Sequence, residues 1–378
     1  MQRTRTNESQ AAVRELSFTG FLLVAGIAFL FTWAAVWAYI AIFPMAYEGR
    51  DYPLALAKNI LMSQCRANQI VVFGDSRAVA GVLPTAMDVP VENLAFPGAS
   101  PVETYFLVKR VLRCPEPPRL VVIAHSASMY PEDKFFWSLF ASLDVLNAAD
   151  IRSVEAKART LGDKELEYAE RPKAIPFKLL PMLYEVHFPP LYFGVLAGGY
   201  VAARWRYNNR ALNEAIRTSG RSSFGTADGS DAISDEAKME DWKVSPLVNL
   251  YLDRTLAMLA AHHVPVMIMT MPINASTCEH LPAVVQPRFS AYLAKIAQAN
   301  PNVELVDSTI PCWPDKFYGD AWHFNMTGTL AYSRKLQGVL VALLHENEVA
   351  AEPRVKAMMT AMTGARLQMP QELESPNE

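Results

Sequence analysis

A stretch without a single charged residue, from Phe18 to Phe43, constrains this chain more than any other feature of its sequence. A helix needs about 20 apolar residues to cross the hydrocarbon core of a bilayer. A secretory signal peptide has an apolar core of only ~7–15 residues and a small-residue cleavage site, which is not evident here. We therefore expect residues 17–44 to form one uncleaved transmembrane helix.

The charges on either side of this stretch predict its orientation. Three arginines come before it, Arg3, Arg5 and Arg14, and Glu48, Arg50 and Asp51 follow it. The positive-inside tendency places residues 1–16 in the cytoplasm and the chain from residue 45 onward outside. In a bacterium, this would be a single-pass protein of the inner membrane with its main domain in the periplasm.

Four cysteines fit such an oxidising compartment, in which disulfides persist. Cys65 and Cys114 each precede a short apolar run, whereas Cys278 and Cys312 each follow one. Four cysteines allow three connectivities. Pairing the cysteines in like positions predicts Cys65–Cys114 and Cys278–Cys312, with one bridge at each end of a parallel sheet.

Beyond the anchor, short runs rich in β-branched residues alternate with helical patterns. The runs cover residues 69–73, 91–95, 119–124, 264–270 and 303–307, and the helical patterns cover 101–113, 245–262, 282–299 and 327–346. Runs that are apolar on both faces suit a buried parallel sheet. The sequence therefore predicts an α/β fold with a doubly wound, five-stranded parallel sheet, preceded by one transmembrane helix. Such folds bind ligands at the carboxyl ends of their strands.

The stretch from about residue 128 to 245 interrupts this alternation, and we expect it to be a helical insertion within a domain of residues 45–345. A polar tail, 346–378, follows the domain. The insertion's aromatic part, Ile175 to Tyr207, runs into Arg204, Arg206 and Arg210. Its apolar side chains either pack against the sheet domain as the insertion's own core or face the membrane or a membrane partner. Because an insertion of this size needs a core, we expect the first arrangement.

Residues able to carry chemistry fall at the ends of the apolar runs. Gly74-Asp75-Ser76 closes the first run, and Asp320 and His323 stand three residues apart before the last helical pattern. A serine after a strand and an Asp–His pair in one loop are the parts of a nucleophilic triad. Ser76 would be the nucleophile, His323 would take its proton, and Asp320 would orient the imidazole.

These motifs, with Asn93-Leu94-Ala95-Phe96-Pro97-Gly98 between them, resemble those of the SGNH (GDSL-type) hydrolases over roughly residues 69–126 and 264–340. The resemblance implies a flavodoxin-like fold and catalysis by Ser76, His323 and Asp320. It also implies an oxyanion hole that uses the backbone N–H groups of Ser76 and Gly98. Asn93 and Arg77 are candidates for substrate contacts, although an arginine at this position more often braces a loop.

One position departs from the family. After the third run the family has an asparagine that donates to the oxyanion, whereas this chain has Ser126, preceded by His125. Loss of one oxyanion donor can cost ~10²–10³ in rate. Either Ser126 or His125 replaces the asparagine and meets the substrate, or the backbone N–H groups suffice, or the chain is non-catalytic.

An anchor followed by such a domain is similar to accessory proteins of surface-polymer acylation, such as the alginate O-acetylation proteins and DltD. The resemblance implies acetyl transfer to an exopolysaccharide beside a membrane-bound O-acyltransferase (MBOAT) or a polysaccharide synthase complex. An esterase or deacetylase with the same triad and a non-catalytic subunit of a polysaccharide synthesis or export complex remain alternatives. The balance of 35 basic and 38 acidic residues gives no sign of a nucleic-acid partner. Neither a Cys/His cluster with zinc spacing nor a glycine loop for phosphates occurs, so we expect no metal and no cofactor.

Overall fold

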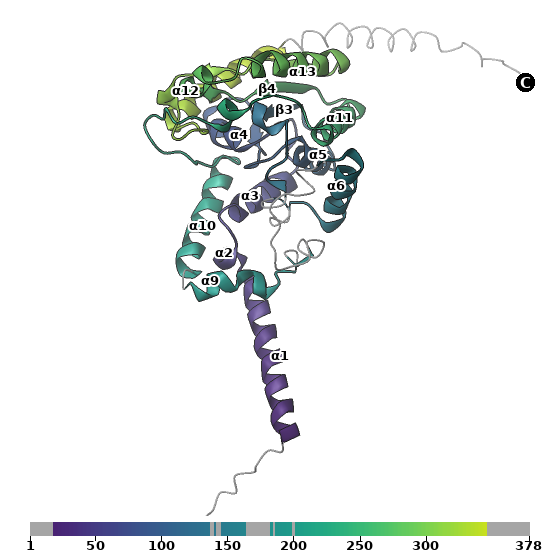
Figure 1. Ribbon diagram of the computed structural model, residues 1–378, viewed down its shortest axis with the longest axis vertical. Coiled ribbons are helices and arrows are strands. Elements are labelled where there is room, and N and C mark those ends of the chain that lie inside the picture. Colours follow the sequence, from purple (N-terminus) through teal and green to yellow (C-terminus); the bar gives the residue numbers. More distant parts are fainter. Residues whose placement is uncertain are drawn as a thin grey trace, which may run out of the picture.

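The computed structural model of the chain describes residues 18–136, 140, 145–163, 182–183, 186–198 and 201–345. The expected cytoplasmic segment 1–16 and polar tail 346–378 lie outside these ranges. In the described part, an α/β domain is joined through a helical base to one long helix that projects away from it (Figure 1).

Five parallel strands form the centre of the domain, in the order β2-β1-β3-β4-β6. They span Val91–Asn93 (β2), Ile70–Gly74 (β1), Leu120–His125 (β3), Val266–Thr270 (β4) and Val303–Leu305 (β6). Every residue of β1, β3 and β4 is buried, as their continuous apolar sequences require. The mixed α/β class and the five-stranded parallel sheet are thus confirmed. A second sheet pairs β5 (Ile273–Asn274) with β7 (Cys312–Trp313).

Helices cover both faces of the five-stranded sheet. On one face, α5 (Pro101–Val111), α11 (Pro246–Ala261) and α13 (Val285–Ala299) pack against Phe73 and Ile123. On the other face, α4 (Ser76–Gly81) and the C-terminal helix, residues 326–345, pack against Val72 and Val122. Alternate residues of each strand therefore enter opposite cores, as the pleat of a strand dictates. Also in the domain, α6 spans Ala148–Leu161, and α3 (Tyr52–Ser63), which the sequence patterns did not predict, contributes to both cores.

The ends of β1 and β3 approach each other closely at Gly74. A Cβ atom on this residue would lie 2.1 Å from the carbonyl oxygen of Ala124 and 2.9 Å from Cβ of Ala78. Only glycine fits between the neighbouring strand and the helix that starts two residues later. The glycine of the Gly74-Asp75-Ser76 motif therefore sets the tight strand-to-helix junction that carries Ser76.

Both expected disulfides are present. Cys65 bonds Cys114, with Cα atoms 5.4 Å apart, before the strands begin, and Cys278 bonds Cys312, with Cα atoms 6.0 Å apart, beyond their carboxyl ends. Pairing by like position is confirmed. Two bridges of this kind fit an oxidising compartment.

The long helix α1 (Phe18–Ile42) has 25 residues and is apolar enough to cross a membrane. Most of its large side chains face outward, with Phe18 77 % and Phe31 76 % exposed. Side chains of this kind need an apolar surrounding outside the chain, so α1 fits a single-pass anchor.

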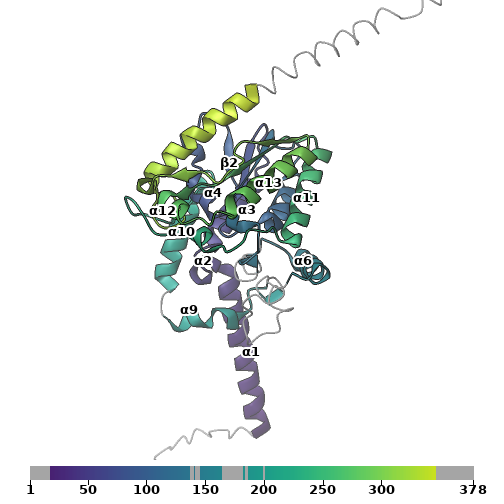
Figure 2. The ribbon, with the colours of Figure 1, turned by 45° about the horizontal axis from the view of Figure 1, so that its top comes forward.

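The helical base lies between α1 and the sheet domain (Figure 2) and corrects one expectation. It comprises α2 (Pro44–Tyr47), the 3-10 turn η5 (Pro189–Tyr192), α9 (Phe193–Ala197) and α10 (Val201–Arg217). In the described part of the aromatic segment, the apolar side chains of Leu191, Tyr192, Val195 and Val201 belong to a separate cluster with the end of α1 and α2, and not to the two cores of the sheet domain. Tyr192 is buried among Ile40, Ala46 and Tyr47 instead. Because the end of α1 gives the described aromatic side chains an apolar surface to pack on, they need no separate core. Other members of the segment lie outside the described residues: Phe177, Leu179, Leu180 and Tyr184.

We predict that Gly74→Ala destabilises the protein by roughly 1–3 kcal/mol, because the added methyl group must displace the β3 backbone or α4. Gly338→Ala is the matched control. It lies in the C-terminal helix with open space around its position, and should stabilise the helix by about 0.5–1 kcal/mol. Thermal unfolding of the full chain in detergent distinguishes the two. Equal melting temperatures for Gly74→Ala and wild type would contradict the steric argument.

Candidate active site

The structure brings Ser76, His323 and Asp320 together, although Asp320 is 244 and His323 is 247 positions after the serine in the sequence. Ser76 Oγ lies 2.8 Å from His323 Nε2. His323 Nδ1 lies 2.8 Å from Asp320 Oδ2 and 3.0 Å from Oδ1. Because Nδ1 faces a carboxylate, it carries the proton, which leaves Nε2 to accept the Ser76 hydroxyl proton. The three groups are therefore arranged as a nucleophile, a base and the acid that orients the base.

Backbone contacts hold the loop that carries Asp320 and His323. Gly319 N donates to His323 O at 2.8 Å, closing a tight turn. Asn325 then anchors the exit from the loop: its side-chain amide donates to Lys316 O at 2.9 Å, and its Oδ1 accepts from Gly328 N at 3.0 Å. The residues after His323 in the motif thus fix the loop in place.

The environment of Asp320 favours its charged form. Partial burial by itself would raise the pKa of Asp320, but the hydrogen bond and positive charge of His323 and the N–H groups of Trp322 and His323 hold this pKa below its usual range. Those two N–H groups donate to Asp320 Oδ1 at 2.8 and 2.7 Å. A carboxylate fixed in this way can stabilise an imidazolium ion on the neighbouring ring.

Asp75 links the two strands behind Ser76. One of its oxygens caps α4 by accepting from Arg77 N at 2.9 Å. The other accepts from Ser126 N at 2.8 Å and from the Ser126 hydroxyl. Asp75 is 1 % exposed, and both of its oxygens accept hydrogen bonds. These bonds join the end of β1 to the end of β3. Its role is structural.

Three residues expected at the site have other contacts in the structure. The Ser126 hydroxyl gives its one proton to Asp75, so it cannot also donate to an oxyanion. His125 is fully buried, with Nε2 3.0 Å from Thr104 Oγ1, and burial lowers the pKa of its imidazole to about 4. Asn93 is also fully buried: its amide donates to Ala78 O and Val82 O, each at 2.9 Å. His125 and Asn93 brace the strand ends and do not line the cavity that contains Ser76.

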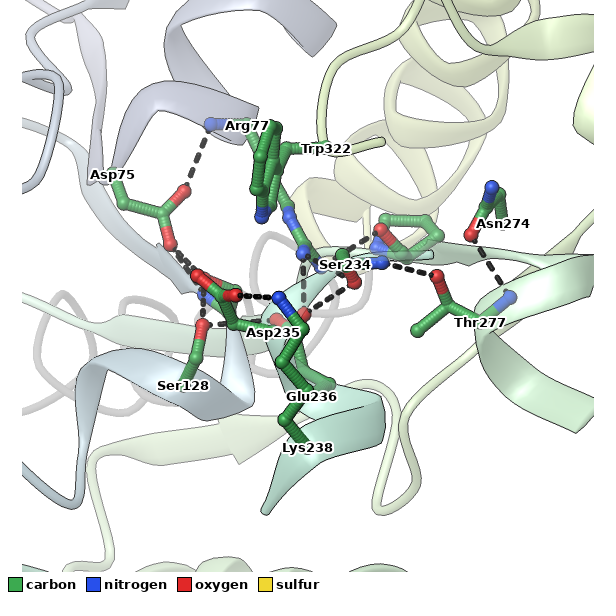
Figure 3. A network of polar contacts seen from close by, with 12 residues as sticks. Asp75, Arg77, Ser128, Ser234, Asp235, Glu236, Lys238, Asn274, Thr277 and Trp322 are labelled. Carbon is green, nitrogen blue, oxygen red and sulfur yellow. Dashed lines mark hydrogen bonds and ion pairs between the residues drawn. The ribbon is translucent and has the colours of Figure 1, made fainter. Parts of the chain in front are cut away.

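Arg77 lines the cavity, but its guanidinium is paired inside the protein. It lies 2.7 Å from Glu236 Oε2, and Glu236 in turn accepts from Ser234 and Ser128 at 2.6 and 2.9 Å (Figure 3). Burial alone would raise the pKa of Glu236, but Arg77 and these hydroxyl groups keep it below its usual range. The Arg77 side chain therefore ties the start of α4, next to Ser76, to the end of the insertion, which is the loop-bracing role.

A cavity of about 480 Å³ opens beside Ser76 and His323. Gly98, with φ +67°, lines it, and a Cβ there would meet the Phe135 ring at 2.7 Å. Phe224 also lines the cavity and packs on His323, with ring centroids 4.7 Å apart. Sequence patterns missed Phe135, Phe224 and Trp322 as cavity residues. The first two belong to the insertion, and no motif marks an aromatic residue in a polar loop.

Two buried carboxyl groups fasten the cavity wall that carries Phe135. Ser100 Oγ lies 2.9 Å from Glu103 Oε2 and 3.0 Å from Asp133 Oδ2, which joins the start of α5 to the segment before Phe135. Burial raises the pKa of Glu103 well above its usual range, and the neighbouring Asp133 raises it further. Burial also raises the pKa of Asp133, to about 6. Both shifts favour the protonated form of the carboxyl group when the wall is in place.

No three His, Cys, Asp or Glu side chains of the described residues converge as metal ligands. Compared with models of known families and with curated proteins, the sequence shows no match. The site must be interpreted from its own geometry.

The carboxyl pair generates a pH prediction. Because the folded-state pKa of Asp133 lies above its unfolded value, this group stabilises the fold at low pH, and its contribution is lost as pH rises from about 4 through about 6. Asp133→Asn should keep the hydrogen bond to Ser100 and remove this pH-dependent loss of stability. The loss amounts to roughly 1–3 kcal/mol for a carboxyl group whose pKa rises by about two on folding. Melting temperatures between pH 4.5 and 7.5 should thus fall less in the variant than in wild type.

The exposed Asp231 offers the control for this experiment. Asp231→Asn should follow the wild-type pH profile. The same pH slope for Asp133→Asn and wild type would show that the pair does not titrate in the folded protein.

Proposed function

We propose that this chain is a membrane-anchored O-acyltransferase of the SGNH type, which moves an acetyl group to hydroxyls of a bacterial exopolysaccharide through an acyl-serine intermediate. The observation that carries the proposal is the pair of contacts at His323: Nε2 2.8 Å from Ser76 Oγ and Nδ1 2.8 Å from Asp320 Oδ2. These contacts lie at the carboxyl edge of a parallel sheet, where α/β folds bind ligands.

The proposed reaction has two halves that use the same groups. Ser76 Oγ attacks the carbonyl carbon of the acyl donor while His323 Nε2 takes the hydroxyl proton. The proton then passes to the leaving group, and the acyl group remains on Ser76. In the second half a sugar hydroxyl attacks the acyl-serine, His323 takes its proton, and Ser76 regains a proton as the ester of the sugar leaves. Asp320 stays ionised and stabilises the imidazolium in both halves.

The oxyanion would rest on backbone donors. Ser76 is the first residue of α4, and Gly98 lines the same cavity. Their N–H groups are the donors that we assign, because the hydroxyl of Ser126 is bonded to Asp75. The hole would then have one donor fewer than the family pattern. We therefore expect a turnover rate ~10²–10³ lower than with a complete oxyanion hole.

The surroundings of Ser76 favour transfer over hydrolysis. Phe135, Phe224 and Trp322 line the cavity, and aromatic walls limit the access of water to an acyl-serine. The long apolar helix α1 supports placement of the domain beside a membrane. We propose a periplasmic location, with an MBOAT-type acyltransferase or a polysaccharide synthase complex as the partner that delivers acyl groups. Water as acceptor, which gives a carbohydrate esterase, is the alternative outcome.

A serine-directed fluorophosphonate tests the nucleophile. Wild type should be labelled at Ser76, whereas His323→Ala should be labelled at least ~10³-fold more slowly, because the hydroxyl has lost its base. Ser128→Ala is the matched control, since Ser128 lines the same cavity but its hydroxyl donates to Glu236; it should still be labelled at Ser76. Unlabelled wild-type protein would favour a non-catalytic subunit, and full labelling of Ser76→Ala would refute the assignment.

Trp322 provides a test of the acceptor. Its side chain is 40 % exposed at the cavity and can stack on a sugar ring. Trp322→Ala should raise KM for an oligosaccharide acceptor about tenfold, as expected for loss of one aromatic contact of ~1.4 kcal/mol, while fluorophosphonate labelling of Ser76 stays at the wild-type rate. Trp322→Phe should retain most of the affinity. If the labelling of Ser76 slowed by the same factor by which the acceptor KM rises, Trp322 would instead be assigned to support of the Asp320 loop.

A further inference from the structure

Residues 186–198, which include η5 and α9, pack against the side of α1. We call this segment the foot. The Phe188 ring lies 6.0 Å from Trp33 and 5.9 Å from Trp37, centroid to centroid. Phe193 contacts Trp33 from the other end of η5, at 6.2 Å. Trp37 Nε1 also donates to Val186 O at 2.7 Å. The foot is therefore attached to α1 itself and not only to the helix's end.

The length of α1 sets the depth of these contacts. A bilayer core accommodates about 20 helical residues, and any stretch of that length within Phe18–Ile42 includes both Trp33 and Trp37. Trp33 is thus inside the membrane wherever along α1 the core is placed. Side chains in contact with it, Phe188 and Phe193, must reach the same depth or the adjacent headgroup layer.

The outward surface of the foot suits that layer. Phe193 is 46 % and Val186 47 % exposed, and at the start of α10 Trp205 and Tyr207 are 48 % and 52 % exposed. Apolar and aromatic side chains of this kind would face water if the foot were above the membrane. Trp and Tyr are enriched where bilayers meet water, because one end of each ring system is apolar and the other polar.

Cations surround this surface. From Val201 to Asn213, α10 has three arginines and no acidic residue: Arg204, whose guanidinium donates to Tyr47 O and Glu48 O, and the exposed Arg206 and Arg210. Arg50 lies over the Tyr207 ring, 5.9 Å from its centroid. Of the acids beside Arg50, Glu48 is buried and accepts from Tyr192 Oη at 2.6 Å, and Asp51 is partly buried. Arginines at this level can contact lipid phosphates while their stems lie along apolar surface.

We propose that the foot is a lipid-binding surface, which lies in the acyl–headgroup boundary of the leaflet nearer the sheet domain. The chain then contacts its membrane at two places, α1 and the foot. One helix alone can rotate and tilt, whereas two contacts fix the domain's orientation. Through α10, whose 17 residues span about 25 Å, the foot would hold the sheet domain at a set height and angle above the lipid (Figure 1).

Spin labels on introduced cysteines test the depth of the foot directly. The described cysteines are all in disulfides, so a single added cysteine can be labelled selectively. Gly194 in α9, Gly26 in α1 and Gly338 in the C-terminal helix each have open space where a Cβ would be added. Gly26→Cys reports the bilayer interior, and Gly338→Cys reports water, since its helix lies on the far side of the domain from α1 (Figure 2). The full chain is placed in vesicles of phosphatidylethanolamine and phosphatidylglycerol.

The ratio of collisions with oxygen to collisions with a water-soluble nickel chelate measures depth. We expect the label at Gly194→Cys to give a ratio severalfold above that at Gly338→Cys and below that at Gly26→Cys. Ala197→Cys, also exposed on α9, should agree with it. Ratios at both α9 positions equal to that at Gly338→Cys would overturn the proposal. So would labels that become protected only when a membrane-protein partner is added.

Discussion

The carboxylate of Asp75 is the interaction on which the arrangement of the site depends. It joins the start of α4, through Arg77 N, to the end of β3, through Ser126. With no room for a side chain at Gly74, the two strand ends meet closely and leave Ser76 at the sheet edge. The Asp320–His323 loop, fixed by Asn325, then needs only one contact to complete the triad.

Much of this arrangement could be predicted from the sequence. Continuous β-branched runs identify strands buried on both faces, so the five strands and the edge where Ser76 and His323 meet follow from pattern alone. Cysteines at like strand ends predict both bridges for the same reason. The contacts of Ser126, His125 and Asn93 could not be predicted, because they depend on which buried polar group each side chain meets after folding. Periodicity shows that such residues are near a strand end but not where they point.

The insertion is where sequence reasoning was weakest, and it supplies much of what surrounds the triad. Phe224 packs on His323, Glu236 holds Arg77, and Asp133 fastens the wall that carries Phe135. None of these has a motif, since each works through a partner distant in sequence. The aromatic segment was expected to need a core within the domain, but its described part packs on α1. The long apolar helix α1 thus changes which side chains the insertion must bury within the domain.

The central claim is that Ser76 and His323 act as one catalytic unit, and a double-mutant comparison tests it most directly. Hydrolysis of an aryl acetate is measured for Ser76→Ala, His323→Ala and the double variant, all with wild-type disulfides and melting behaviour. When two residues act in the same step, removing either one removes the contribution of both. The double variant should therefore be no slower than either single variant. Losses that multiply, or a single variant that keeps the wild-type rate, would contradict the account.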